Sequence, residues 1–153
     1  LLVFTDERAG REVGTATLYL EGQRLAYYYY AFYDLNYYAR NLGMYMMTSA
    51  VAHFAAAGFR HLYLGSCYLP NALYKTQFAG AEFFNGVRWS GNLKELRFLV
   101  ERERGEVTQH LLETEAYRET FYLGGLPEIV ETSPFRLRCP PSSQQTPTSS
   151  NQR

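Results

Sequence analysis

The stretch that decides the fold runs from Tyr33 to Phe84 and reads YDLNYYARNLGMYMMTSAVAHFAAAGFRHLYLGSCYLPNALYKTQFAGAEFF. An aromatic run ends at its start, and apolar residues then recur at helical spacing over Leu42–Ala57. A second short apolar segment, Arg60–Gly65, is followed by Pro70, a residue suited to the first turn of a helix. The order strand, helix, strand, helix predicts a parallel crossover at the centre of a mixed α/β sheet.

Two further strands are predicted upstream. Leu1–Phe4 is a short apolar run, and Glu12–Leu20 alternates between two faces that are rich in β-branched and aromatic residues. Glu21-Gly22-Gln23 supplies a hairpin turn into a third strand, Arg24–Asp34. That strand is apolar or aromatic on both faces, which is typical of a central strand covered on both sides. Its consecutive tyrosines, Tyr27 to Tyr30, fit either packing or a surface on which a base stacks.

Downstream of the crossover, Asn85-Gly86 predicts a hairpin between two short apolar pieces. Ser90 and Asn92 are residues typical of helix caps, and apolar residues then follow at helical spacing over Leu93–Val100. We predict one more helix over residues 106–122.

The C-terminal residues have a different composition. From Ser133 on, Pro, Ser, Gln and Thr dominate and few apolar residues remain, which predicts a disordered tail. We therefore expect one folded domain over residues 1–132 and a tail over residues 133–153. Because Leu1 lies within an apolar stretch and is not preceded by a methionine, we expect the chain to be a piece of a longer protein.

Composition and charge limit the classes of function. Among 153 residues, 46% are hydrophobic, and 15 Lys and Arg balance 15 Asp and Glu. Zero net charge argues against strong non-specific binding of nucleic acid, but it is compatible with a local basic pocket. The separated cysteines Cys67 and Cys139 match neither a zinc spacing nor a disulfide framework. With no apolar run of membrane-spanning length and no visible signal peptide, we expect a cytoplasmic protein without a membrane partner.

Two predicted helix starts, Arg40–Tyr45 and Leu69–Lys75, lie just beyond two predicted strand ends. Helix N-termini present unpaired N–H groups and a partial positive charge, so they bind anions such as phosphate. We expect any chemistry of the chain to lie between these two strand ends.

The order of the elements resembles the later two-thirds of the GNAT acyltransferase fold. In that family an Arg/Gln-x-x-Gly-x-Gly/Ala motif wraps the pyrophosphate of acyl-CoA at a helix start. The segment Arg40-Asn41-Leu42-Gly43-Met44-Tyr45 matches the motif at Arg40 and Gly43, and departs from it at Tyr45, where the family has a small residue. The resemblance implies a GNAT-like mixed sheet: an antiparallel hairpin, then a β-α-β-α crossover, with helices on both faces.

A closer resemblance is to the C-terminal GNAT-like domain of aminoacyl-tRNA–protein transferases, the arginyl and leucyl transferase family. Four motifs carry it, in the same order and at similar separations: Phe32-Tyr33-Asp34, Leu42-Gly43-Met44-Tyr45, Tyr63-Leu64-Gly65 and Tyr74-Lys75. The resemblance implies aminolysis, in which an aminoacyl group moves from aminoacyl-tRNA to an amine such as a protein N-terminus. It also implies no tightly bound cofactor. Aminoacyl-tRNA or acyl-CoA would be the co-substrate, and a tRNA acceptor end and a peptide or protein amine would be the partners.

The same motifs supply the candidate site residues. Tyr74 is the candidate proton donor to the leaving oxygen or sulfur, and is equally well explained as a core aromatic. Asp34 is the candidate that orients the attacking amine or a charged aminoacyl side chain, and is equally well explained as a cap of the following loop. The predicted substrate- and phosphate-binding residues are Arg40, Asn41, Gly43, Met44, Tyr45, Asn71 and Lys75.

Three functions remain open at this point. The first is aminoacyl transfer, and the second is acyl-CoA-dependent N-acetyltransfer by a GNAT enzyme. The third is a non-catalytic GNAT-like binding module, which the bulky Tyr45 and the lack of an obvious general base favour. We predict no metal site. The acyl donor, the acceptor and the oligomeric state do not follow from the sequence.

Overall fold

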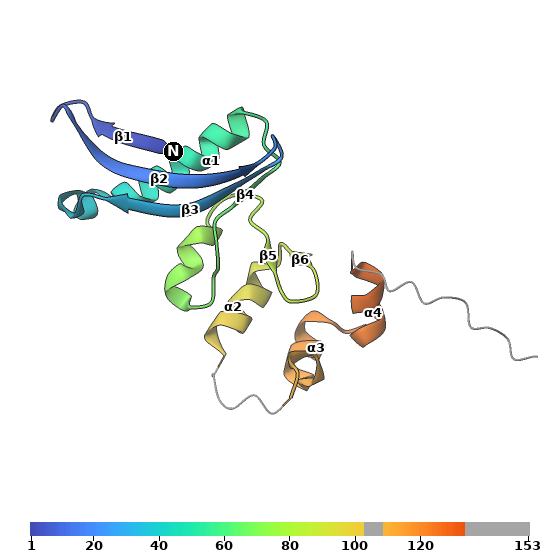
Figure 1. Ribbon diagram of the computed structural model, residues 1–153. Helices are drawn as coiled ribbons and strands as arrows, with labels where there is room; N and C mark the ends of the chain where they lie inside the picture. The colour runs from blue at the N-terminus through green and yellow to red at the C-terminus, as the bar shows by residue number, and fades with distance from the viewer. Residues whose placement is uncertain (103–108, 134–153) are drawn as a thin grey trace, which may run out of the picture. The chain divides into compact units, whose positions relative to one another are not determined.

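The computed structural model describes residues 1–102 and 109–133, and Figure 1 shows its elements. Backbone contacts divide the chain into two compact units, Leu1–Lys75 and a second unit that begins at Thr76. The tail predicted over residues 133–153 lies outside the described residues except for Ser133, as do residues 106–108 of the last predicted helix.

The first unit is built on a four-stranded sheet in the order β1-β2-β3-β4. Its strands are β1 (Leu2–Asp6), β2 (Arg11–Glu21), β3 (Leu25–Tyr33) and β4 (His61–Tyr63). β1, β2 and β3 are antiparallel neighbours, whereas β4 is parallel to β3. The predicted mixed α/β sheet, with its hairpin and its parallel crossover, is therefore confirmed.

The parallel pairing is short. It joins Leu25 to His61, Ala26 to Leu62 and Tyr27 to Tyr63, and β3 then continues alone on that side as far as Tyr33. On its other side β3 pairs with β2 through a β-bulge, since Thr17 lies opposite Tyr30 and Leu18 opposite Tyr28, so Tyr29 is the extra residue.

One face of the sheet is covered by α1 (Leu42–Ala56), which lies behind the strands in Figure 1. Four of its buried residues, Leu42, Met46, Ala50 and Phe54, are spaced four apart and form a single apolar stripe. The packing against β2 is close, because a Cβ on Gly14 would lie 2.7 Å from the Met46 sulfur. The helix predicted over Leu42–Ala57 is confirmed.

Within the first unit the opposite face of the sheet is open. Tyr29, Tyr30 and Phe32 are each more than 60% exposed, so within residues 1–75 the prediction that helices cover both faces is wrong. The tyrosine rings instead pack against one another: the Tyr27 ring centroid lies 5.5 Å from that of Tyr29 and 5.2 Å from that of Tyr63. Tyrosine tolerates this position because its ring packs while its hydroxyl stays in water.

Two 3₁₀ helices connect these elements. η1 (Leu35–Arg40) follows β3, and η2 (Pro70–Thr76) follows the loop after β4. The helix start predicted over Leu69–Lys75 is therefore confirmed in position, but its turns are 3₁₀, a tighter form than the α-helix.

The second unit contains a short hairpin and a group of helices. Their bounds are β5 (Phe83–Phe84), β6 (Trp89–Ser90), α2 (Leu93–Glu101), η3 (Leu111–Glu113), α3 (Glu115–Phe121) and α4 (Gly125–Thr132). The Asn85-Gly86 hairpin and the Leu93–Val100 helix are confirmed. The single helix predicted over residues 106–122 is broken in its described part, because Thr114 has extended backbone angles between η3 and α3.

A buried carboxylate holds the second unit together. Glu95 is only 1% exposed, and its two oxygens accept four hydrogen bonds. Tyr117 donates at 2.6 Å, Tyr122 and Asn85 at 2.8 Å, and Ser90 at 2.9 Å. This network joins β6 and the hairpin turn to α2 and α3.

Candidate functional site

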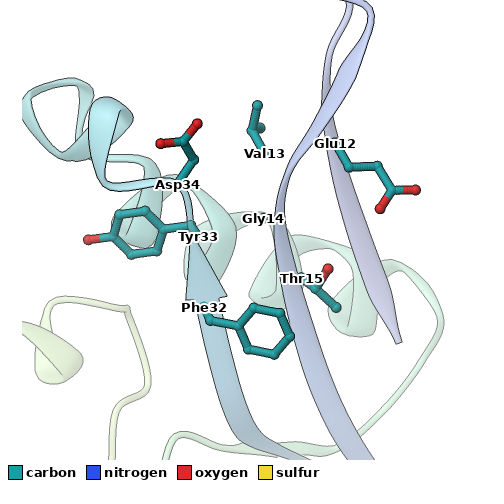
Figure 2. Close-up of a pocket in the computed structure, with 7 residues that line it drawn as sticks. All are labelled: Glu12, Val13, Gly14, Thr15, Phe32, Tyr33 and Asp34. Atoms are coloured by element: carbon teal, nitrogen blue, oxygen red, sulfur yellow. The ribbon is translucent and has the colours of Figure 1, made fainter.

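A hollow of about 260 Å³ lies at the C-terminal end of β3. We call it the strand-end hollow; its lining residues are Glu12, Val13, Gly14, Thr15, Phe32, Tyr33 and Asp34. Figure 2 shows the Tyr33 ring pointing away from the Phe32 ring, with the Asp34 carboxylate beyond both at the end of the strand.

Asp34, the first predicted catalytic residue, is engaged in two local interactions. One carboxylate oxygen accepts a hydrogen bond from the Asn36 backbone N–H at 2.9 Å and caps η1. The other pairs with the Arg11 guanidinium at 2.7 Å. The hydrogen bond from Asn36, followed by the interactions with Arg11, lowers the pKa of Asp34. The carboxylate is therefore ionised at neutral pH, and the capping role weighed from the sequence is confirmed.

Arg40, the predicted phosphate ligand, is the last residue of η1 and is exposed. Its guanidinium lies 5.4 Å from the centre of the Tyr37 ring, and that of Arg11 lies 5.8 Å from the same ring. The Tyr37 hydroxyl donates to Asp6 at 2.6 Å. The Tyr37 side chain is thus contacted by two arginines and by Asp6.

The start of α1 has some features of an anion site. Asn41 has left-handed backbone angles (φ 54°, ψ 37°), and its side chain makes no cap hydrogen bond. The first turn of this described helix contains no acidic residue. The first turn of α1 therefore supplies no negative charge of its own to the positive end of the helix dipole.

The remaining predicted residues of this turn have their own packing. A Cβ on Gly43 would lie 2.8 Å from Cε1 of Tyr33, so close approach of that ring explains the glycine without any ligand. The Met44 carbonyl accepts a hydrogen bond from the Thr48 hydroxyl at 2.9 Å. Tyr45 is 63% exposed, and its ring lies edge-on to Phe4 at 6.2 Å.

The other predicted residues lie on η2. Tyr74 is 49% exposed and Asn71 is exposed. Lys75 donates from Nζ to the Ser66 carbonyl at 3.0 Å, which ties η2 to the loop that follows β4. The alternative that Tyr74 is a core aromatic does not hold, because half of its side chain is in solvent.

Tyr28 is a residue that sequence reasoning missed. It is 7% exposed, and its buried hydroxyl finds no hydrogen-bond partner within residues 1–102 and 109–133. Burial, with a contribution from nearby Tyr74, raises the pKa of Tyr28 to about 12. No sequence signal distinguishes this tyrosine from its neighbours in the run Tyr27 to Tyr30.

The predicted residues therefore fall in two places. Asp34, Arg40 and Gly43 lie near the strand-end hollow, where Gly43 faces Tyr33. Tyr74 instead interacts electrostatically with Tyr28. Tyr28 precedes Tyr33 by five residues in β3, and five residues of a strand span roughly 16 Å. Within residues 1–102 and 109–133 no hydrogen bond, ion pair or ring contact joins Arg40 or Gly43 to Tyr74.

Comparisons with known proteins do not add an identity. The chain matches no model of a known protein family, no curated protein and no solved structure. Within residues 1–102 and 109–133 no three His, Cys, Asp or Glu side chains are grouped to hold a metal ion. No described helix is long and apolar enough to cross a bilayer. Residues 1–102 and 109–133 thus define a mixed α/β protein with a hollow at the end of β3 and with the buried, unpaired Tyr28 hydroxyl next to its parallel strand pair.

Proposed function

We propose that this chain transfers an aminoacyl group from aminoacyl-tRNA to an amine such as a protein N-terminus, within a GNAT-like fold. The observation that carries the proposal is the parallel β3–β4 pair, which stops after Tyr27 and Tyr63. Tyr28, with its buried hydroxyl, is the first residue of β3 beyond that point, and it interacts electrostatically with Tyr74, which is 49% exposed. A proton donor held next to a water-excluded polar group is what ester aminolysis needs.

The reaction balances without a metal or a protein nucleophile. The amine nitrogen attacks the ester carbonyl carbon, the new C–N bond forms, and the carbonyl π electrons move to oxygen. The tetrahedral intermediate then collapses and the C–O bond to the terminal ribose breaks. Tyr74 gives its proton to the departing oxygen and regains one from the ammonium through solvent. The net result is an amide and a free ribose hydroxyl.

The donor would bind along β3. Arg40 and the Gly43 N–H in the first turn of α1 are suited to a phosphate, with Asn41 fixing the helix start; the Tyr45 N–H already donates to the Asn41 carbonyl at 3.0 Å. The distance from there to Tyr74 favours a donor that carries phosphates along its length, as a single-stranded acceptor end does. Asn71 and Lys75 flank Tyr74 on η2 and would contact the terminal nucleotide. Asp34, which stays ionised, would hold the acceptor ammonium or a basic aminoacyl side chain.

Transfer is tested directly with the full chain. Aminoacyl-tRNA labelled on the amino acid is mixed with a peptide that has a free N-terminus, and the peptide mass is followed. We expect an increase by one aminoacyl residue, and none with an N-acetylated peptide, which lacks the attacking amine. Acetyl-CoA replaces the charged tRNA in a parallel reaction. Acetylation of the peptide with no aminoacyl transfer would overturn the proposal in favour of an N-acetyltransferase.

A non-catalytic binding module is the second candidate. The specific observation in its favour is that the Asp34 carboxylate is already paired with Arg11 and with the Asn36 N–H, so this predicted catalytic residue is engaged in local structure. Such a module would bind charged tRNA or a peptide end and leave the peptide mass unchanged. Binding without turnover in the same assay would therefore select it.

Arg40→Ala is expected to raise the dissociation constant for aminoacyl-tRNA by about ten- to a hundred-fold, because a charge-assisted contact with phosphate is lost. The dissociation constant is measured by filter binding at two salt concentrations, since a lost phosphate contact also reduces the salt dependence. Arg97→Ala, which removes one positive charge from the exposed side of α2, is the matched control. Equal effects of the two variants would mean that Arg40 contributes only net charge.

A further inference from the structure

The Tyr28 hydroxyl is an exception among the buried tyrosines of this chain. Tyr117 and Tyr122, which are 1% and 2% exposed, both donate to Glu95. Tyr28 is 7% exposed and its hydroxyl has no partner among the described residues. Buried hydroxyls are normally paired because an unpaired one loses its hydration without compensation. A polar group kept in this state is a candidate for pairing with a ligand.

The position of Tyr28 in the sheet follows from two irregularities. It is the first residue of β3 beyond the three pairs with β4, so on that side its backbone has no strand neighbour. It also precedes the bulge residue Tyr29. The rings of Tyr27 and Tyr29 contact one another on the open face, so the alternation of a strand directs Tyr28 to the face that α1 covers. Bulges commonly redirect side chains next to functional sites.

Tyr74 is the electrostatic neighbour of this hydroxyl. The segment that carries it is held by the hydrogen bond from Lys75 to the Ser66 carbonyl. The raised pKa of Tyr28, about 12, keeps its hydroxyl protonated at neutral pH. A neutral buried donor at the first residue of β3 beyond the parallel pairs therefore interacts electrostatically with an exposed tyrosine.

We propose that the Tyr28 hydroxyl donates a hydrogen bond to the carbonyl oxygen of the acyl donor and stabilises the oxyanion that forms when the amine adds. The inference rests on the proposed aminoacyl transfer and assigns the reaction centre a second residue. Tyr28 keeps its proton throughout: the oxyanion accepts the hydrogen bond, then re-forms the carbonyl as the C–O bond breaks. Tyr74 protonates the leaving oxygen. A preorganised donor in a buried site acts most strongly on the charge that develops in the transition state.

Tyr28→Phe is the test, because it removes only the hydroxyl. We expect kcat for transfer to fall by about 10²–10³-fold, the loss typical of one oxyanion donor, while the dissociation constant of the donor changes little. The melting temperature should stay the same or rise, because the variant no longer buries an unpaired polar group. Tyr117→Phe, which removes a paired hydroxyl, should lower the melting temperature. Tyr19→Phe, at an exposed tyrosine of β2, should leave both activity and stability unchanged.

A second measurement separates this inference from the proposed function. An aminoacyl-adenosine analogue with a tetrahedral phosphonate in place of the ester carries the negative oxygen that Tyr28 would meet. Its dissociation constant should rise about 10²–10³-fold in Tyr28→Phe. If the wild-type chain transfers nothing but binds the analogue in this Tyr28-dependent way, the transfer function fails and the oxyanion site stands. If transfer and analogue binding are the same in Tyr28→Phe and wild type, the site fails while the function stands.

Two other outcomes would overturn the inference. If Tyr28→Phe lowers the melting temperature as much as Tyr117→Phe does, the hydroxyl is paired in the free protein and is structural. If the wild-type chain neither transfers nor binds the analogue, the function and the site fail together.

Discussion

Replacing Glu95 by leucine is expected to lower the free energy of unfolding of the second unit by about 3–5 kcal/mol. The carboxylate accepts hydrogen bonds from Tyr117, Tyr122 and two other side chains, and leucine accepts none. The donors would stay buried without an acceptor, and each such group costs about 1–3 kcal/mol. Because whole domains are stable by only about 5–15 kcal/mol, this loss is large enough to unfold the unit in part of the population.

Urea unfolding followed by tryptophan fluorescence measures the effect, since Trp89, the only tryptophan of the chain, lies in β6 of the second unit. Glu95→Gln keeps one oxygen acceptor and the shape of the side chain, so its loss should be smaller than that of Glu95→Leu. Glu101→Gln, at the exposed end of the same helix, should change stability by less than about 0.5 kcal/mol. A Glu95→Leu variant as stable as Glu101→Gln would show that the network does not stabilise the unit.

The pH dependence of unfolding is an independent test of the hydrogen bonds to Glu95. Burial alone would raise the pKa of Glu95, but hydrogen bonds from Tyr117, Asn85, Tyr122 and Ser90 outweigh it and lower the pKa. A carboxyl whose folded pKa is depressed contributes stability that is complete above its unfolded pKa and is lost as pH falls through the folded pKa. Burial and Glu95 raise the pKa of Tyr117, so stability should also fall above about pH 10. Glu95→Gln should flatten the acid side.

Much of the first unit could be predicted because its signals are local. The helical spacing of apolar residues in α1 and the alternation of residues in β2 can each be recognised from one continuous segment of sequence. The crossover from β3 to β4 follows from their order alone, since a strand, a helix and a second strand in succession favour parallel neighbours. Asn85-Gly86 and Asn92 likewise specify a turn and a cap through their own backbone preferences.

The features that the sequence did not reveal depend on distant residues. Asn92-x-x-Glu95 has the spacing of a capping box, a motif normally found at an exposed helix start. Here the Glu95 carboxylate instead meets Tyr117 and Tyr122, more than twenty residues later, so its burial follows from tertiary packing.

In the candidate site, too, local features could be predicted from the sequence and long-range contacts could not. Gly43 was predicted to approach phosphate, but the contact that explains it is the ring of Tyr33, ten residues earlier. The bulge opposite Thr17 and Leu18 breaks the simple alternation of the tyrosine run, and only the paired strand reveals which hydroxyl is buried. Residue types at the strand ends could therefore be read from the sequence, while their partners could not.

Replacing Tyr74 by phenylalanine is expected to lower the rate of aminoacyl transfer by roughly 10²–10⁴-fold, as loss of a general acid typically does. The ring remains, and the side chain is half exposed, so the fold and the melting temperature should be unaffected. Donor affinity should change little, because the proton is needed only when the C–O bond breaks. The rate is measured in single-turnover mode with saturating protein, so that product release does not mask the chemical step.

Tyr68→Phe is the matched control, since Tyr68 is 73% exposed in the loop just before η2 and belongs to neither predicted group of site residues. Its transfer rate should equal that of the wild type. If Tyr74→Phe also transfers at the wild-type rate, the leaving group takes its proton from solvent and Tyr74 is not catalytic.

The chemistry of the leaving group separates Tyr74 from Tyr28. A general acid matters most when the leaving group is strongly basic, so an aminoacyl thioester or an ester of an acidic alcohol should need Tyr74 much less than the ribose ester does. The defect of Tyr74→Phe should therefore shrink with such donors. The defect of Tyr28→Phe should persist, because every one of these donors forms an oxyanion at the carbonyl. If the rate defects of both variants became smaller to the same extent, Tyr74 and Tyr28 would not have separate roles. The two hydroxyls would instead act together on the departing group.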